Sequence, residues 1–167
     1  MGRLEGKMAV ITGGGSGMGR AEAILFAKEG AKVVVTDLNV EAAQETVKEI
    51  SENGGEAIAV SHNVVKKENW EEVYNQTIDT FGKLDILVNN AGISQPMSMD
   101  ELTEEQWDKI VDINMKGTFL GIQLAIPLFR ENNGGSIVNI SSIAGLTGSS
   151  GAGAYTASKG GVRLWTN

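Results

Sequence analysis

Short, almost continuously apolar runs alternate along the chain with longer stretches in which apolar positions recur at helical spacing. The apolar runs are rich in β-branched residues and occupy 8–12, 32–37, 56–60, 85–88 and 136–141. Such runs are typical of strands in a parallel sheet that is covered on both faces. The amphipathic stretches, which predict helices, lie near 17–30, 40–53, 66–82 and 103–131.

The repeated order of strand and helix, with short connections, predicts right-handed crossovers and a doubly wound parallel α/β sheet. The chain has 167 residues, is 41% hydrophobic and shows neither an internal repeat nor a linker, so we expect one domain over 1–167. The net charge of -7 comes from scattered acids, and no basic tract suggests a nucleic-acid partner. No apolar run approaches the roughly 20 residues that span a bilayer. Because cysteine is also absent, we expect a soluble cytoplasmic protein without a metal site.

A glycine-rich turn, TGGGSGMG at 12–19, follows the first expected strand and leads into a helical pattern. Glycines at this junction let backbone N–H groups and a helix N-terminus approach a pyrophosphate, although an isolated glycine cluster is equally often a flexible turn. A second strand that ends at Asp37 favours the binding site, because a carboxylate there can accept hydrogen bonds from an adenosine ribose. It would also repel a 2′-phosphate, and neither Leu38 nor Asn39 supplies a cation. The pattern predicts a Rossmann-like site for NAD rather than NADP.

Tyr155 and Lys159 are one turn apart on the same face if 152–166 is a helix. A phenol with a pKa of about 10 is a weak base at neutral pH. A cation about 4 Å away, at an effective dielectric near 20, would favour the phenolate by roughly 4 kcal/mol, or about three pKa units. This pair predicts a general base, although taken alone it is more often two ordinary surface side chains.

Two further polar residues strengthen the prediction of a catalytic site. Ser142 ends the fifth expected strand, and its hydroxyl can donate to a developing alkoxide, although serine there is also a common turn residue. Asn114 shares the apolar face of its helix with Trp107, Ile110 and Val111. A buried amide without partners costs about 1–3 kcal/mol, so Asn114 either ties neighbouring backbone or links to the catalytic groups, directly or through water.

In combination, these residues resemble the short-chain dehydrogenase/reductase family, and in particular its NAD-dependent secondary-alcohol dehydrogenases. The matching motifs are Thr12-Gly13-x-x-x-Gly17-x-Gly19, Asn89-Asn90-Ala91-Gly92, Asn114, Ser142 and Tyr155-x-x-x-Lys159. The resemblance implies that Tyr155 is the general acid or base, that Lys159 lowers its pKa and holds the nicotinamide ribose, and that Ser142 positions the substrate oxygen. It also implies a water-linked proton path from Asn114 to Lys159.

The glycine turn, the second strand and the resemblance together predict the residues that bind NAD. They are Gly13, Gly15, Ser16, Gly17, Met18, Gly19, Asp37, Asn63, Val64, Asn90, Ala91, Gly92, Tyr155 and Lys159. The resemblance further implies that Asn89–Gly92 lines the adenosine side of the cofactor and steadies the central sheet. Where the family commonly has an aspartate near the adenine, this chain has Asn63. An amide can also meet the adenine edge, so we expect a modest effect on affinity.

Family members normally continue beyond the Tyr-Lys helix with further strands, a substrate-covering segment and part of the oligomer interface, whereas this chain stops at Asn167. We therefore expect the C-terminal part of the fold to be missing. Two interpretations follow: the 167 residues are part of a longer functional protein, which we favour, or they form a nucleotide-binding fragment with little turnover.

The stretches 84–108 and 131–158, which are expected to frame the reacting carbon, contain no Lys or Arg that would pair with a carboxylate or phosphate. The apolar candidates for the pocket wall are Met97, Met99, Ile143 and Leu146. This composition predicts a neutral, fairly hydrophobic secondary alcohol, or its ketone, as the substrate.

A stripe of small residues, Gly117, Gly121 and Ala125, would let another backbone come close to the long helix. In the family this helix pairs with its copy, so we expect a homo-oligomer, a dimer or a tetramer. Packing within the subunit explains the stripe almost as well.

Two other functions compete with a dehydrogenase. A hydrolase fits poorly, because the one histidine, His62, is far from Ser142 in the chain and no G-x-S-x-G motif is present. A cofactor-binding protein without catalysis is the stronger alternative.

Overall fold

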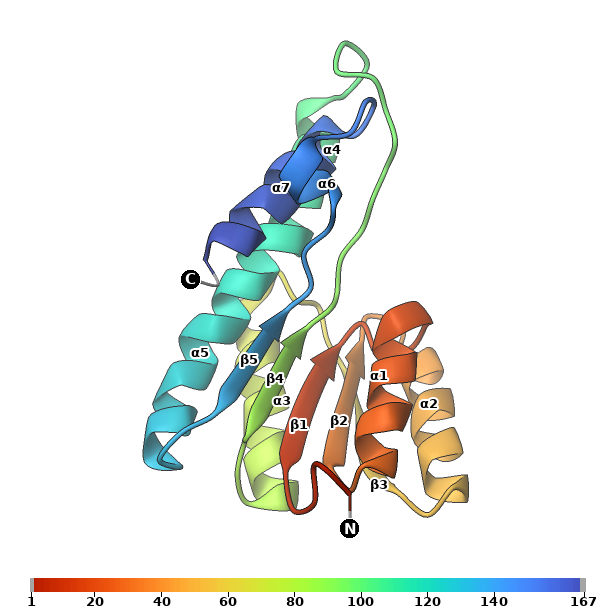
Figure 1. Ribbon diagram of the computed structural model, residues 1–167, viewed down its shortest axis with the longest axis vertical. Coiled ribbons are helices and arrows are strands. Elements are labelled where there is room, and N and C mark those ends of the chain that lie inside the picture. The colour runs from red at the N-terminus through yellow and green to blue at the C-terminus, as the bar shows by residue number, and fades with distance from the viewer. Residues whose placement is uncertain (1, 166–167) are drawn as a thin grey trace.

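Residues 2–165 of the protein are described by a computed structural model, in which helices pack on a five-stranded parallel sheet (Figure 1). In chain order the strands are β1 (Met8–Thr12), β2 (Lys32–Asp37), β3 (Glu56–Ser61), β4 (Ile86–Asn89) and β5 (Ser136–Asn139). Their order in the sheet is β3-β2-β1-β4-β5, and each neighbouring pair is parallel. This confirms the predicted doubly wound α/β sheet.

Successive residues of the central strands pack against opposite helix layers. The main covering helices are α1 (Gly17–Lys28), α2 (Val40–Glu52), α3 (Lys67–Phe81) and α5 (Gly117–Glu131). Ile11 of β1 belongs to a buried cluster with residues of α1 and α2, whereas its neighbour Val10 belongs to a cluster with residues of α3 and α5. A strand that is buried on both faces has no polar positions to alternate with apolar ones, which explains the continuous apolar runs in the sequence.

The stretch 103–131, which we expect to be helical, consists of three consecutive segments. They are α4 (Glu104–Val111), a π-helical segment η1 (Asp112–Lys116) and α5. Two more helices follow β5: a short α6 (Ala144–Thr147), which the sequence pattern does not predict, and α7 (Gly153–Leu164). The helix expected over 152–166 is thus confirmed for 153–164, and residue 166 lies outside the described residues.

The small-residue stripe on α5 is occupied within the subunit. A Cβ at Gly117 would lie 2.8 Å from the Val64 side chain, and one at Gly121 would lie 2.5 Å from the Trp70 ring. Ala125 is fully buried as well. Of the two explanations for the stripe, packing inside the subunit is therefore the correct one.

The order in which strands are added to the sheet reverses beside β1. The chain passes from β1 outward through β2 and β3, and it then returns to the other side of β1 with β4 and β5. In open parallel sheets the ligand crevice lies at this switch point, outside the carboxyl ends of the strands. The glycine turn, which follows β1, and Asn90, which follows β4, both lie at this edge.

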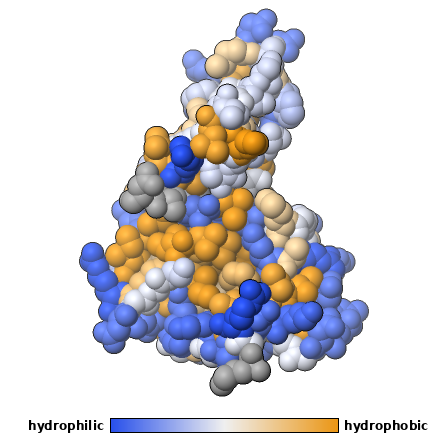
Figure 2. Space-filling model, in the orientation of Figure 1, coloured by the Kyte–Doolittle hydropathy of each residue, from blue (hydrophilic) through white to orange (hydrophobic). Residues whose placement is uncertain are grey.

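The surface over β4 and β5 is apolar. Figure 2 shows hydrophobic side chains gathered over this part of the sheet. The exposed apolar side chains of these strands include Val138 of β5, which is 40% exposed. Among residues 2–165, no helix is both long enough and apolar enough to cross a membrane.

Candidate active site

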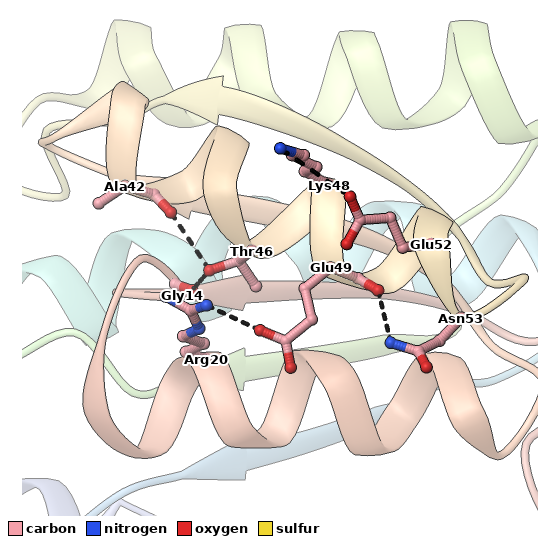
Figure 3. A network of polar contacts seen from close by, with 8 residues as sticks. All are labelled: Gly14, Arg20, Ala42, Thr46, Lys48, Glu49, Glu52 and Asn53. Atoms are coloured by element: carbon pink, nitrogen blue, oxygen red, sulfur yellow. Dashed lines mark hydrogen bonds and ion pairs between the residues drawn. The ribbon is translucent and has the colours of Figure 1, made fainter.

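The glycine turn between β1 and α1 is bonded to its neighbours in the sheet and the helix layer. The N–H of Gly14 donates to the carbonyl of Thr36 in β2 over 2.9 Å. The carbonyl of Gly14 accepts from the Thr46 hydroxyl of α2 over 3.0 Å (Figure 3). In the same view, Arg20 of α1 pairs with Glu49 of α2 over 2.7 Å. These contacts hold the turn in one position relative to β2 and α2.

The start of α1 faces the crevice without a side-chain cap. Ser16 precedes the helix in an extended conformation, with φ of -153°, and its hydroxyl makes no capping hydrogen bond. Gly13 and Gly17 have φ values of +65° and +53°, which glycine adopts without strain. The uncapped N–H groups and the positive end of the helix dipole attract anions, so the residues present fit a pyrophosphate.

Asn90 ties the end of β4 to the glycine turn. Its Nδ2 donates to the carbonyl of Thr12 over 2.8 Å and, more weakly, to that of Gly13 over 3.3 Å. Gly19 of α1 packs against the same group, because a Cβ there would collide with the Gly13 carbonyl and the Asn90 amide. Both residues therefore shape the turn. Asn89, one residue earlier, donates to Asn139 Oδ1 of β5 over 2.9 Å and so links the two strands.

A cavity of about 420 Å³ opens between the turn and the ends of β2, β3 and β4. It is lined by Gly13, Ser16, Gly17, Met18, Asp37, Leu38, His62, Asn63, Val64, Asn90, Ala91, Gly92, Ile93 and Ile113. Most of the residues predicted to bind the cofactor thus lie around one cavity. Among the described residues that line this cavity there is no Lys or Arg. Four of the predicted residues, Gly15, Gly19, Tyr155 and Lys159, do not line it.

Asp37 ends β2 at the rim of this cavity. Its Oδ2 accepts from the N–H of Gly15 over 3.0 Å, and its Oδ1 accepts from the N–H of Asn39 over 3.0 Å. Gly15, although it does not line the cavity, therefore orients the carboxylate that does. A Cβ at Gly15 would lie 2.9 Å from Oδ2, so a larger residue would displace this group.

Tyr155 and Lys159 share one face of α7, as the spacing predicts. The Nζ of Lys159 lies 5.9 Å from the centroid of the Tyr155 ring. Lys159 is 5% exposed, and burial lowers the pKa of its ammonium group. Nζ donates to the carbonyl of Ile140, just after β5, over 2.7 Å. Gly92, which lines the cavity, approaches from the other side, where a Cβ would lie 3.3 Å from Nζ. The ammonium is thus enclosed between β5, α7 and the cavity wall.

Three consecutive residues after β5 support this arrangement. The carbonyl of Ile140 accepts from Nζ of Lys159, and the next side chain, Ser141, donates from Oγ to the main-chain carbonyl of Lys159 over 2.8 Å. The side-chain ammonium and the main-chain carbonyl of Lys159 are therefore both bonded to the segment Ile140–Ser141. Ser142 follows, half-buried, and its Oγ accepts from the N–H of Ala144 at the start of α6 over 3.2 Å.

Asn114 is buried in the π-helical segment and uses its whole amide. Its Oδ1 accepts from the N–H of Ile93 over 2.8 Å, and its Nδ2 donates to the carbonyl of Ile93 over 2.9 Å and to Ser158 Oγ over 3.0 Å. Ser158 in turn donates to the carbonyl of Tyr155 over 2.7 Å. Asn114 therefore ties neighbouring backbone, and through Ser158 it also contacts the helix of the Tyr-Lys pair. Its link to the phenol of Tyr155 and the ammonium of Lys159 stays a prediction. Single π-turns of this kind occur frequently at functional sites.

His62 is buried between β2 and α3 at the far end of the cavity. Its Nδ1 lies 2.9 Å from Thr36 Oγ1, and its ring meets Trp70 edge-on with centroids 4.3 Å apart. Burial lowers the pKa of His62 to about 4, so the ring is neutral at physiological pH. Trp70 continues the contact by donating from Nε1 to the carbonyl of Val64 over 2.9 Å. This group supports the loop after β3.

Sequence reasoning missed several residues that complete the site. Ser141 and Ser158 form hydrogen bonds with α7 or from it, and Ile93 supplies the backbone that Asn114 binds. Ile113 lines the cavity next to Asn114. The position of Ser158, three residues after Tyr155, was the one available signal, because it lies on the same side of α7 as the pair.

The comparisons with known proteins agree with this architecture. A family model described as short chain dehydrogenase matches residues 7–167. A 2,5-dichloro-2,5-cyclohexadiene-1,4-diol dehydrogenase of Sphingobium indicum is 44% identical over 97% of this chain and 65% of its own length. A cyclopentanol dehydrogenase of Comamonas is 42% identical over 99% of this chain and 66% of its own. A 3-oxoacyl-(acyl-carrier-protein) reductase of Thermotoga maritima is 40% identical over 96% and 65%.

A solved structure shares the fold throughout. The crystal structure of a short chain dehydrogenase from Mycobacterium avium superposes with a TM-score of 0.95 and is 38% identical. It covers 99% of this chain, which corresponds to 62% of that protein. This chain therefore spans less than two thirds of the length of the relatives that it matches.

A parallel sheet with a glycine turn at its switch point defines a Rossmann-like protein. Within that class, the match over almost its whole length shows that the chain belongs to the short-chain dehydrogenase family of oxidoreductases. Members of this family generally use NAD or NADP.

Proposed function

We propose that the protein is an NAD-dependent dehydrogenase that interconverts a neutral secondary alcohol and its ketone, with Tyr155 as general acid and base. The observation that carries this proposal is the position of α7. The buried Lys159 lies on this helix, with its Nζ 5.9 Å from the centroid of the Tyr155 ring. Gly92, which lines the cavity beside the glycine turn, is next to this ammonium group, because a Cβ at Gly92 would lie 3.3 Å from Nζ.

In this mechanism a residue of α7 accepts and returns the reacting proton. Tyr155, on the same face of α7 as the buried Lys159, accepts the hydroxyl proton as the carbinol carbon loses its hydride. Asp37 and the start of α1 would hold NAD at the cavity, and the cofactor would supply the hydride acceptor for this step. Ser142 donates to the substrate oxygen and holds it toward Tyr155. In the reverse direction Tyr155 returns the proton to the oxygen of the ketone.

Three features of the cavity support NAD as the cofactor. The start of α1 supplies uncapped N–H groups for the pyrophosphate. The Asp37 carboxylate, held by the N–H groups of Gly15 and Asn39, suits a ribose hydroxyl and repels a 2′-phosphate. Leu38, 72% exposed beside it, carries no charge that would bind such a phosphate. On this basis Asp37 would hold the adenosine ribose, and Lys159 would lie on the side of the nicotinamide.

The substrate side supports a neutral, fairly apolar compound. Ile143, Leu146 and Met99 are 75%, 58% and 68% exposed, so their side chains are available for contact. Met97 joins this wall to α7 through a bridge with Ala152. The cyclopentanol and chlorinated diol dehydrogenases among the relatives agree with this substrate class. The acyl-carrier-protein reductase represents the alternative class.

The test measures NADH production with a panel of cyclic and aromatic secondary alcohols and with an acyl-carrier thioester. We expect turnover of the simple alcohols by the wild type and its loss in Tyr155→Phe, with NADH binding retained. Tyr74→Phe, which removes the other phenol of the chain, is the matched control and should keep turnover. Turnover that survives Tyr155→Phe would remove Tyr155 from its role, and preference for the thioester would reject the substrate class.

Binding of NAD without turnover in any variant would favour a second function, that of a nucleotide-binding protein. The exposure of the apolar substrate wall favours this alternative, because a pocket open to water binds an apolar alcohol weakly. The same wild-type assay therefore separates the two functions.

We further infer that the protein is a homo-oligomer. Phe119 and Ile126 on the outer face of α5, with Trp107 on α4, are 45%, 37% and 37% exposed and offer an apolar surface for a second copy. A monomeric mass in solution at micromolar concentration would contradict this inference. The cysteine-free composition supports a cytoplasmic location.

A further inference from the structure

The segment that follows β5 lies against α7 at Lys159. Ile140, Ser141 and Gly145 of this segment each meet a different part of the lysine. The Ile140 carbonyl accepts from Nζ over 2.7 Å, and Ser141 Oγ donates to the main-chain carbonyl over 2.8 Å. A Cβ at Gly145 would lie 2.7 Å from the carbonyl carbon of Lys159. What Ser141 contributes to the reaction rests on the proposed function, in which Lys159 lies beside the general base Tyr155.

The Ser141 bond attaches α7 to its surroundings and is not part of the helix itself. In an α-helix a main-chain carbonyl accepts from the N–H four residues further on, and its oxygen has a second lone pair. For Lys159 this N–H belongs to Arg163, so the Ser141 hydroxyl uses the lone pair that the helix leaves free. Removing the hydroxyl should therefore leave α7 helical and change how the helix is held.

Hydrogen bonds to two separate elements hold α7 at successive residues. Asn114 of η1 donates to Ser158 Oγ over 3.0 Å, and Ser141, after β5, donates to the carbonyl of Lys159. A helix that is bonded at two places resists rotation about its axis better than a helix bonded at one. Tyr155 lies one turn before Lys159, so a rotation of α7 would move the phenol and the ammonium group relative to the cavity.

The ammonium group of Lys159 depends on one acceptor. Among residues 2–165 its Nζ donates to the Ile140 carbonyl and forms no ion pair. A long side chain keeps its position only if this acceptor keeps its own position relative to the helix. Ser141 is the residue after Ile140, and its bond fixes that peptide against the main chain of Lys159. The lysine is thus held at its base and at its end by neighbouring residues.

No charged group on the neighbouring elements replaces this arrangement. The segments 89–93 and 136–147 carry no titratable side chain. Burial of the ammonium group, rather than a nearby charge, therefore lowers the pKa of Lys159. Apart from Tyr155, the titratable residues of the surrounding helices lie at the surface, namely Arg163, Asp112, Lys116, Glu104, Glu105, Asp108 and Lys109.

We propose that Ser141 is a positioning residue for the dehydrogenase reaction. Its hydroxyl holds the main chain of Lys159 against the segment after β5, so the ammonium group stays buried between the Ile140 carbonyl and Gly92. Tyr155, one turn earlier on the same helix, thereby keeps its place relative to this group. Without the hydroxyl, α7 still forms, but the ammonium group is more hydrated and the pair is less well aligned for proton transfer.

An NMR titration of the lysine side chains tests the proposal without relying on turnover. Protein labelled with carbon-13 at lysine Cε gives separate lysine signals, and Lys159→Met identifies the signal of Lys159. In Ser141→Ala we expect the pKa of Lys159 to rise toward its ordinary value, because water reaches the ammonium group more easily. Ser141→Thr keeps the hydroxyl and should keep the wild-type pKa. Ser141→Cys, with a weak S–H donor, covers the case in which Ser141→Ala does not fold, and it should show a smaller rise.

Thr77→Val is the matched control. Thr77 is buried in α3 and its hydroxyl donates to the Val73 carbonyl over 2.7 Å, so this variant also removes a hydroxyl that is bonded to a helix carbonyl. It should lower the melting temperature but leave the pKa of Lys159 and kcat unchanged. With NAD and a secondary alcohol, Ser141→Ala should lower kcat about tenfold, the effect of one lost hydrogen bond, while KM for the alcohol changes less than about twofold.

Two results would overturn the proposal: an unchanged pKa of Lys159 in both Ser141→Ala and Ser141→Cys, or a loss of kcat in Thr77→Val as large as in Ser141→Ala. Turnover by the wild type with either result would leave the proposed function intact and remove the role of Ser141 alone. Absence of turnover in the wild type would overturn the proposed function, and the NMR titration would still decide whether Ser141 fixes the ammonium group.

Discussion

His62 is the one histidine of the chain, so its effect on stability can be measured without interference from another imidazole. Burial lowers its pKa to about 4, whereas an unfolded chain leaves histidine near 6.5. Above pH 6.5 the ring is neutral in both states, and the full stability is present. As the pH falls from 6.5 toward 4, the unfolded state binds a proton that the native state refuses, so the free energy of unfolding decreases.

The size of this effect follows from the two pKa values. At pH 5 the linkage relation predicts a loss of about 2 kcal/mol relative to pH 7.5, and below pH 4 the contribution levels off near 3 kcal/mol. The perturbation is His62→Gln, which keeps a polar side chain near Thr36 and cannot titrate. It should cost stability at both pH values, because the edge contact with Trp70 is lost, but it should remove the pH-dependent part.

Urea unfolding followed by tryptophan fluorescence at pH 7.5 and pH 5.0 measures both proteins. For each protein, the free energy of unfolding at pH 5.0 is subtracted from that at pH 7.5. The carboxylates contribute equally to this difference in the wild type and in the variant, so the difference between the two proteins is the contribution of His62. We expect about 2 kcal/mol for this double difference. A value below about 0.5 kcal/mol would show that the ring accepts a proton in the folded protein, and the description of His62 as a neutral support of the loop after β3 would be wrong.

Three further substitutions test the site. Gly92→Ala places a methyl group about 3.3 Å from the Lys159 ammonium. We expect turnover to fall at least tenfold, with the melting temperature nearly unchanged. Normal turnover would contradict the proximity of that ammonium to the cavity wall. Ser158→Ala removes an acceptor from the buried Asn114 amide, so chemical denaturation should show a loss of about 1–3 kcal/mol, and an unchanged midpoint would reject the bond. Asp37→Ala should weaken NAD binding, and the Kd for NADP relative to that for NAD should fall about tenfold. If a titration gives the same ratio of the two Kd values as in the wild type, Asp37 is not the group that discriminates between the two cofactors.

The regular elements of the fold were largely predictable. The apolar runs marked all five strands to within two residues at each end. The local signal is strong for β1, β2 and β4, because most of their residues are buried on both faces of the sheet. The three segments between 104 and 131 were not distinguishable, since the apolar spacing of a helix continues through one π-turn. The four-residue α6 left no periodic pattern to detect.

The chemistry of the site was predictable in its residue types and less so in its contacts. Tyr155 and Lys159 are neighbours on one helix, so their shared face followed from local spacing. The partner of the ammonium did not, because the Ile140 carbonyl lies on another element. Ser158 was missed for the same reason, since its role depends on Asn114, which is 44 residues away.

Periodicity, glycine positions and short-range spacing therefore predicted the order of strands and helices, the glycine turn after β1 and the shared face of Tyr155 and Lys159, because each of these depends on residues close together in the chain. The neutral state of His62 and the enclosure of Lys159 were decided by the tertiary structure. They depend on burial and on hydrogen-bond partners from other elements, and both arise only when distant segments pack against each other.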